Sequence, residues 1–188
     1  AHCIYLDDSE IRMMAETGTG VAHCPSSNMR LGSGIAKIRQ MLDEGVKVGL
    51  AVDGSASNDR SSMLDEARQA MLLQRVEQGA DGLTVLEALK IATVGSASVL
   101  GRDDIGRIAP DMAADFIGYR VDRPEMAGGA VHDPVAALLL ASPYTVDLSV
   151  INGRVVVDDG ELLGVDMEKL VSRHNELAYA MASRHPQD

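Results

Sequence analysis

The sequence has no tryptophan, one phenylalanine and two cysteines among its 188 residues. Because only 3% of residues are aromatic, a core has to be built from aliphatic side chains and from the ten methionines. Cys3 and Cys24 are too few for a disulfide framework and lack the spacing of a zinc knuckle, so we expect a reducing, cytoplasmic setting. No apolar run reaches the roughly 18 residues that a membrane span needs.

Positive charge is also scarce. Lys and Arg number 17 against 28 Asp and Glu, which gives a formal net charge of −11. This excess repels phosphate backbones and anionic lipids, so we expect neither nucleic-acid nor membrane binding. The first residues carry no initiator Met and no signal-peptide pattern, and they open inside an apparent strand. We therefore expect a piece of a longer protein.

The first half alternates between two kinds of hydrophobic pattern. The expected order is strand, helix, strand, helix, strand at residues 1–6, 7–18, 20–25, 35–45 and 46–53. Such alternation predicts βαβ units and a parallel sheet, which places the chain in the α/β class. A Rossmann-like binding domain is disfavoured because no Gly-x-Gly-x-x-Gly follows a strand.

The connections and later helices have their own signals. Residues 26–34 are polar and glycine-bearing, which predicts a loop. A long helix is expected at 63–78, and Thr84 with Glu87 forms a capping-box pattern that opens another helix to about residue 100. The inner face of the first of these helices is predicted to carry Leu64, Ala67, Met71, Leu72 and Val76.

The second half changes style. A strand at 113–119 and an irregular loop at 122–134 are followed by the clearest hairpin, at 146–160, with Asn152-Gly153 as its type I′ turn. A final amphipathic helix is expected at 166–185. Its predicted inward residues are Met167, Leu170, Val171, Leu177 and Met181.

Asp53 is the first candidate for chemistry. It ends the apolar run 46–52, and a buried charge there is costly unless a cation lies beside it. In α/β folds the carboxyl ends of strands are where ligands and catalytic groups gather. Asp53 is therefore a candidate metal ligand or catalytic base. The alternative is an aspartate that caps its own loop through hydrogen bonds.

His2 and His23 belong to the other two predicted strands. Imidazole and carboxylate groups converging from parallel strands suit a mononuclear zinc or iron hydrolase. Both histidines could instead be satisfied structural groups, and Asn28 and Asn58 could be turn residues. Cys24 is expected to be a small buried hydrophobe rather than a nucleophile. The remaining histidines are expected to be structural or solvated: His132, His174 and His185.

Longer motifs narrow these alternatives. Residues 1–6, 18–35 (with His-Cys-Pro-Ser-Ser-Asn at 23–28) and 49–59 closely resemble the amidohydrolase superfamily, in its cytosine deaminase-like branch. Residues 106–115 and 150–157 are similar as well, so the resemblance covers nearly the whole chain. Within the branch the motifs are most similar to those of 8-oxoguanine deaminases, with triazine aminohydrolases of the hydroxyatrazine type as near relatives.

The resemblance implies the C-terminal part of a (β/α)8 amidohydrolase barrel. It implies that residues 1–103 supply strands six to eight with their helices, 104–165 a small antiparallel β-sandwich segment, and 166–188 a C-terminal helix. The family's His-x-His pair, its fifth-strand metal histidine and the glutamate three residues later have no counterpart here. Asp111 departs from the family's usual glycine in the turn before Met112.

The implied activity is metal-dependent hydrolytic deamination of an amino-substituted heterocycle, a purine such as 8-oxoguanine, by a longer enzyme. Asp53 matches a metal ligand that also accepts a proton from the attacking water, and His2 matches a histidine that contacts substrate and that water. The resemblance also places four residues near the pocket: His23, Asn28, Ser57 and Asn58.

The implied cofactor is one divalent metal ion, zinc first and iron second, with its other ligands outside this chain. The expected partners are a small heterocyclic substrate and water, and the full-length form is expected to be a homo-oligomer. Two alternatives stay open. The full-length protein could be a triazine aminohydrolase, or this chain could be a fragment without catalysis of its own, either inert or a scaffold for other chains.

Overall fold

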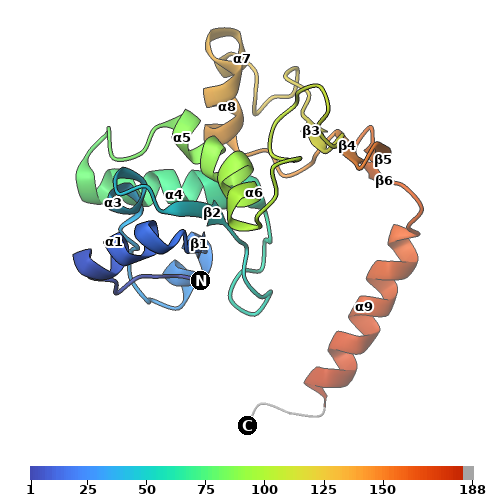
Figure 1. The fold of residues 1–188 in the computed structure, drawn as a ribbon. Helices are drawn as coiled ribbons and strands as arrows, with labels where there is room; N and C mark the ends of the chain where they lie inside the picture. The colour runs from blue at the N-terminus through green and yellow to red at the C-terminus, as the bar shows by residue number, and fades with distance from the viewer. Residues whose placement is uncertain (184–188) are drawn as a thin grey trace.

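A computed structural model describes residues 1–183, and it is centred on two short parallel strands. Strand β1 (Gly20–His23) pairs with β2 (Lys47–Leu50), with His23 opposite Leu50 at the carboxyl ends. The helices α1 (Asp8–Thr17) and α3 (Ile38–Asp43) lie beside them (Figure 1). The predicted βαβ arrangement and parallel pairing are confirmed for this pair.

Helix boundaries in this region follow local chemistry. A capping box between Asp7 and Glu10 begins α1, and Gly18 ends it with φ of 66°. The predicted loop at 26–34 is partly wrong, because residues Pro25–Arg30 form the helix α2. Proline at the first position explains this, since its fixed φ suits a helix start and its missing N–H is not needed there.

The first segment is not a strand, contrary to the prediction for residues 1–6. His2 and Cys3 have φ of 65° and 50°, which is left-handed backbone rather than extended chain. The His2 N–H still donates to the Ala22 carbonyl oxygen of β1, at 3.0 Å. The segment therefore lies beside β1 but turns instead of continuing along it.

The long helix α4 (Met63–Gln78) is confirmed, but its inner face differs from the prediction. Val76 is 79% exposed, whereas Glu66 and Gln74 are buried together with Ala67 and Met71. The two polar residues are tolerated inside because both are hydrogen-bonded: Gln74 binds the backbone of Ala36 and Arg39. A hydrophobicity pattern alone cannot identify such satisfied polar positions.

The capping box of Thr84 and Glu87 is confirmed at the start of α5 (Val85–Lys90). The helix continues through a π-helical turn, η1 (Ile91–Gly95), into α6 (Ser96–Val99). Gly49 lets this segment pack directly on β2, because a Cβ there would lie 2.7 Å from the Ser96 Cα. The Ser96 hydroxyl also accepts the Leu50 N–H, at 3.0 Å.

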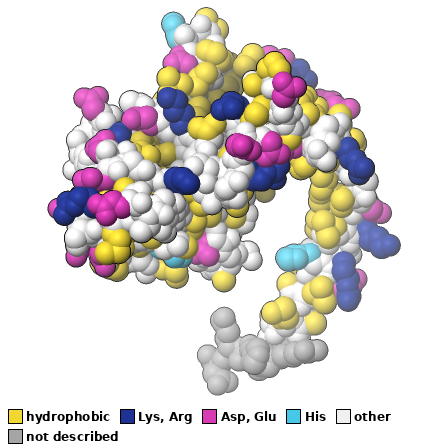
Figure 2. Space-filling model, in the orientation of Figure 1, with side chains coloured by type: hydrophobic (Ala, Val, Ile, Leu, Met, Phe, Trp, Pro, Cys, Tyr) yellow, Lys and Arg dark blue, Asp and Glu magenta, His cyan; other side chains and the backbone are white. Residues whose placement is uncertain are grey.

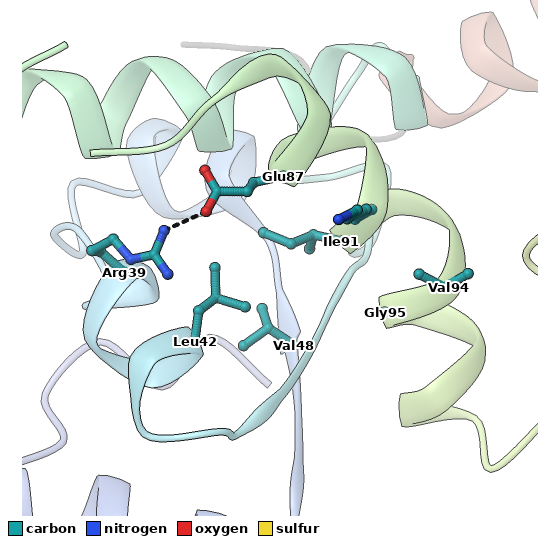
Figure 3. Close-up of a pocket in the computed structure, with 8 residues that line it drawn as sticks. Arg39, Leu42, Val48, Glu87, Ile91, Val94 and Gly95 are labelled. Carbon is teal, nitrogen blue, oxygen red and sulfur yellow. Dashed lines mark hydrogen bonds and ion pairs between the residues drawn. The ribbon is translucent and has the colours of Figure 1, made fainter. Parts of the chain in front are cut away.

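A hollow of about 230 Å³ lies between α3 and the α5–η1 segment (Figure 3). Its walls are mostly apolar, and Arg39 and Glu87 form an ion pair at its edge, at 2.7 Å. The residue of β2 that lines this hollow is Val48, five residues before Asp53. The hollow therefore lies towards the start of the strand and away from the predicted site.

The second sheet is antiparallel, in the order β3-β4-β5-β6. Its strands are Phe116–Gly118, Leu148–Ile151, Arg154–Asp158 and Glu161–Leu162. Asn152 and Gly153 have φ of 49° and 76°, which confirms the predicted type I′ hairpin. Residues 122–134 are not wholly irregular, because α7 (Gly129–His132) lies within them and α8 (Pro134–Ala141) follows. His132 is exposed on α7.

Helix α9 (Met167–Ala182) is present as predicted but projects from the rest of the molecule (Figure 1). Its expected inward residues are all exposed, which corrects that prediction; hydrophobic side chains run along the helix in Figure 2. His174 is exposed, and His185 lies outside the described residues. Within residues 1–183, no helix combines the length and apolar character needed to cross a bilayer.

Candidate active site

Asp53 lies three residues beyond the end of β2, in left-handed backbone with φ of 63°. Two hydroxyl groups converge on its Oδ2: Ser27 donates at 2.6 Å and Ser57 at 3.1 Å. The two hydroxyl oxygens lie 2.9 Å from each other. Ser57 follows Asp53 in the same loop, whereas Ser27 comes from α2, so the carboxylate is held from two elements.

The surroundings of Asp53 favour its ionised form. The hydrogen bond from Ser27 is the main reason that its pKa lies below the ordinary value, and the Gly54 amide, Ser57 and nearby His2 act in the same direction. The side chain is 34% exposed. The group therefore stands as an accessible carboxylate, able to bind a cation or accept a proton.

His2 lies next to this carboxylate, as the sequence predicts for two groups of one site. Its Nε2 is 3.8 Å from Asp53 Oδ2, and its Nδ1 is 2.8 Å from Asn28 Oδ1. Because an amide oxygen only accepts, Nδ1 carries a proton and Nε2 faces Asp53. The neutral ring thus presents a lone pair to the carboxylate side, and the doubly protonated ring presents an N–H.

A second polar cluster lies behind the first. The Asn58 side-chain amide donates to the Val52 carbonyl and to Glu66 Oε1, both at 2.9 Å. Glu66 Oε2 accepts the Ser26 N–H at 3.1 Å. Burial raises the pKa of Glu66, and its hydrogen bonds with Ser26 and Asn58 oppose that rise.

Ser27 and Glu66 were not among the residues predicted from the sequence. Ser27 belongs to a serine–asparagine run that reads as turn chemistry, and its contact with Asp53 spans 26 residues. Glu66 lies in the first turn of α4, where an acidic residue is normally explained by the helix dipole. Helical periodicity does indicate that Glu66 is buried, because it lies on the same face of α4 as Ala67 and Ala70.

His23 is the last residue of β1, Cys24 follows it before α2, and both are buried. Burial lowers the pKa of His23 to about 4, and the neighbouring His2 adds to this. Among residues 1–183 neither ring nitrogen of His23 has a hydrogen-bond partner, so the alternative of a hydrogen-bonded structural histidine is not met there. Burial also raises the pKa of Cys24 to about 11, in line with a buried hydrophobe rather than a nucleophile.

A polar hollow of about 300 Å³ adjoins the site. Ser57 and Asn58 line it together with Ser26 and three charged or polar side chains of α2 and α4. Ion pairs cross its wall, from Arg30 to Asp59 and from Arg60 to Asp65. The structure thus brings His2, Asn28, Ser57 and Asn58 close to Asp53, while His23 lies buried beside His2.

The donor types at this site fit zinc, although they are incomplete. A carboxylate and an imidazole nitrogen are both common zinc ligands, and these two are 3.8 Å apart. Across residues 1–183, no group of three His, Cys, Asp or Glu side chains is placed to hold a metal ion. Since catalytic zinc takes three protein ligands, this chain offers part of a site.

Residues 1–156 match the sequence model of the amidohydrolase family, so the chain belongs to that family. It is 46% identical over 181 residues to an 8-oxoguanine deaminase from Pseudomonas aeruginosa, covering 96% of this chain and 40% of the relative. It is 40% identical over 186 residues to a 5-methylthioadenosine/S-adenosylhomocysteine deaminase from Pelotomaculum thermopropionicum, covering 98% and 42%. The chain thus spans about two fifths of the length of these curated relatives.

Solved structures agree with this assignment. Atrazine chlorohydrolase TrzN from Arthrobacter aurescens TC1, complexed with zinc, is 35% identical with a TM-score of 0.87, covering 94% of this chain and 39% of that one. An adenosine deaminase from Xanthomonas campestris with bound zinc is 30% identical with a TM-score of 0.91, covering 97% and 42%. The chain has the mixed α/β fold of part of an amidohydrolase.

Proposed function

We propose that this chain is the C-terminal part of a zinc-dependent aminohydrolase that deaminates an amino-substituted heterocycle, a purine such as 8-oxoguanine. The observation that carries the proposal is the junction of Asp53 and His2, 3.8 Å apart and each oriented by a further polar side chain. Family membership and deaminase-named relatives support the reaction class.

The proposed architecture assigns residues 1–103 to the end of a (β/α)8 barrel, 104–165 to a small β-sandwich and 166–188 to a C-terminal helix. In this assignment β1 and β2 are the seventh and eighth barrel strands, and the turn at 1–6 follows the position of the sixth. Parallel pairing of β1 with β2 supports it. The longer enzyme is proposed to act as a homo-oligomer in the cytoplasm.

Asp53 would be the metal ligand contributed by this chain, with His2 Nε2 beside it and the other ligands supplied by the rest of the enzyme. A bound divalent ion, zinc before iron, would lower the pKa of the attacking water. The zinc in related solved structures supports this choice of metal.

The chain's own residues then move and place protons. Asp53 takes one proton from the water as its oxygen bonds to the amino-bearing ring carbon, and later gives it to the nitrogen that leaves as ammonia. His2, protonated at both nitrogens, donates from Nε2 to the developing oxygen while Asn28 holds its Nδ1. A group outside this chain would protonate the ring nitrogen and recover a proton from the attached hydroxyl when the carbonyl forms and ammonia leaves. His23, Ser57 and Asn58 are proposed to shape the pocket around this centre.

A triazine is the second candidate substrate. The triazine hydrolase and atrazine chlorohydrolase structures, at 35–36% identity, support it. A panel of 8-oxoguanine, methylthioadenosine and hydroxyatrazine separates these substrates, with the full-length enzyme assayed for ammonia release from the two purines and for alkylamine release from hydroxyatrazine.

The test of the assigned chemistry is Asp53→Asn in the full-length enzyme. We expect deamination to fall by about 10²–10⁴-fold, because the amide cannot carry the proton and binds a cation weakly. Asp103→Asn, an exposed carboxylate elsewhere in the chain, is the control and should retain wild-type activity. Deamination by Asp53→Asn within about tenfold of wild type would refute the role.

A further inference from the structure

Glu66 is the least expected group in this region, because it is a carboxylate that is only 1% exposed. Charged side chains are rarely buried unless they have partners. Both oxygens of Glu66 are used: Oε1 accepts from the Asn58 amide and Oε2 from the Ser26 N–H. These two donors belong to different elements, the loop after β2 and the start of α2.

The hydrogen bond from Asn58 is the first arm of this arrangement, and it ties Glu66 to the loop that carries Asp53. Asn58 donates from one nitrogen both to Glu66 and to the Val52 carbonyl, and its oxygen accepts the Ser61 N–H. The loop from residue 53 to 58 is therefore closed on itself and tied to α4. Ser57, which donates to Asp53, lies directly before Asn58.

The hydrogen bond from the Ser26 N–H is the second arm, and it ties Glu66 to the start of α2. The Ser26 N–H that binds Glu66 directly precedes Ser27, whose hydroxyl is the closer donor to Asp53. One buried carboxylate thus fixes the residues adjacent to both serines. Moving either arm would shift a hydroxyl that holds Asp53 Oδ2.

We infer that Glu66 is a positioning residue for Asp53: it clamps the Asp53 loop to the start of α2, so that Ser27 and Ser57 hold the carboxylate ready for the metal ion and for proton transfer. This inference rests on the proposed function. It adds a buried group that touches neither substrate nor metal but acts through Asn58 and Ser26.

The test is Glu66→Gln in the full-length enzyme. Glutamine has the same size, but its NH2 group would face one of two N–H donors, so one arm of the clamp is lost. We expect the affinity of the apo-enzyme for Zn²⁺ to fall by about tenfold to a hundredfold, measured by titration with zinc alone. We expect kcat to fall with KM nearly unchanged. Glu77→Gln, an exposed position on the same helix, is the matched control and should change neither.

Coupling to Ser27 separates positioning from a purely structural role. If Glu66 acts through Ser27, Glu66→Gln should weaken zinc binding much less in a Ser27→Ala background than in wild type. Additive losses, or unchanged zinc affinity, would overturn the inference. Loss of folding in both Glu66→Gln and Glu66→Asp would also overturn it, because Glu66 would then serve the fold alone. A wild-type enzyme that binds zinc but deaminates no heterocycle would refute the proposed function. The zinc affinities of the variants would still test the role of Glu66.

Discussion

Left-handed backbone marks several single residues of this chain, including both central residues of the candidate site. His2 and Asp53 have φ of 65° and 63°, a region that side chains other than glycine rarely adopt. Such conformations persist only where the surroundings hold them. Here His2 donates to Asn28, and Asp53 accepts from Ser27 and Ser57. The strain at these two residues thus coincides with the proposed chemistry.

Asp111 has the same conformation, with φ of 63°, but it is exposed. Left-handed backbone costs a residue with a Cβ roughly 1 kcal/mol. We therefore expect Asp111→Gly to raise the free energy of unfolding by up to about that amount, measured by urea denaturation. Asp111→Ala should not raise it, because alanine keeps the Cβ. A glycine variant less stable than wild type would contradict this account.

The sequence predicts the site's central pair, and the structure brings Asp53 and His2 together. It did not predict Ser27 or Glu66, which support this pair. Ser27 acts across 26 residues and Glu66 across 40, and no local pattern encodes contacts of that range. The strand expected at residues 1–6 failed for a related reason: its apolar residues suit a strand, but His2 and Cys3 turn sharply beside β1.

At the level of elements, caps and turns were the most predictable features. The Thr84–Glu87 box, the Asn152–Gly153 turn and the glycine after α1 depend on neighbouring residues only, so their signals are complete in the sequence. Packing faces were less predictable. Val76 and the apolar side of α9 follow helical periodicity but are exposed, because periodicity does not say whether a partner surface is present.

Glu87 links one such cap to tertiary structure. It accepts the Thr84 N–H and pairs with Arg39, and these contacts hold its pKa at about 2 instead of 4.5. A depressed carboxyl pKa adds stability that is present above about pH 4.5 and is lost as the pH falls towards 2. We expect Glu87→Gln to lower the free energy of unfolding by roughly 1 kcal/mol at pH 7, with the difference shrinking below pH 4.5.

The measurement for Glu87 is chemical denaturation at several pH values, followed by circular dichroism. Glu77→Gln serves as the reference, because that glutamate is exposed and belongs to a different helix, α4. A wild-type advantage that stayed constant from pH 7 to pH 2 would show that the charge of Glu87 does not stabilise the cap.

For the whole molecule, the central question is how much of an enzyme these 188 residues contain. Asp53 is the candidate metal ligand with His2 beside it, and within residues 1–183 no three metal-binding side chains are placed together. We expect the purified chain alone to retain well below one equivalent of zinc after dialysis, and the full-length enzyme to retain about one. Elemental analysis by mass spectrometry gives both values. Tight stoichiometric zinc in the 188-residue chain would mean that the site is complete without the rest of the enzyme.

Helix α9 offers a reporter of a different kind. Its sixteen residues are all exposed, and the helix is held mainly by its own Asp166 cap and one Arg173–Glu176 pair. A lone helix of that length is only marginally stable in water. In the isolated chain, proteases such as chymotrypsin should therefore trim this end first, with the cleaved product ending near Leu162 or Leu163. Resistance of the same bonds in a longer protein would report that the hydrophobic stripe of α9 has become covered.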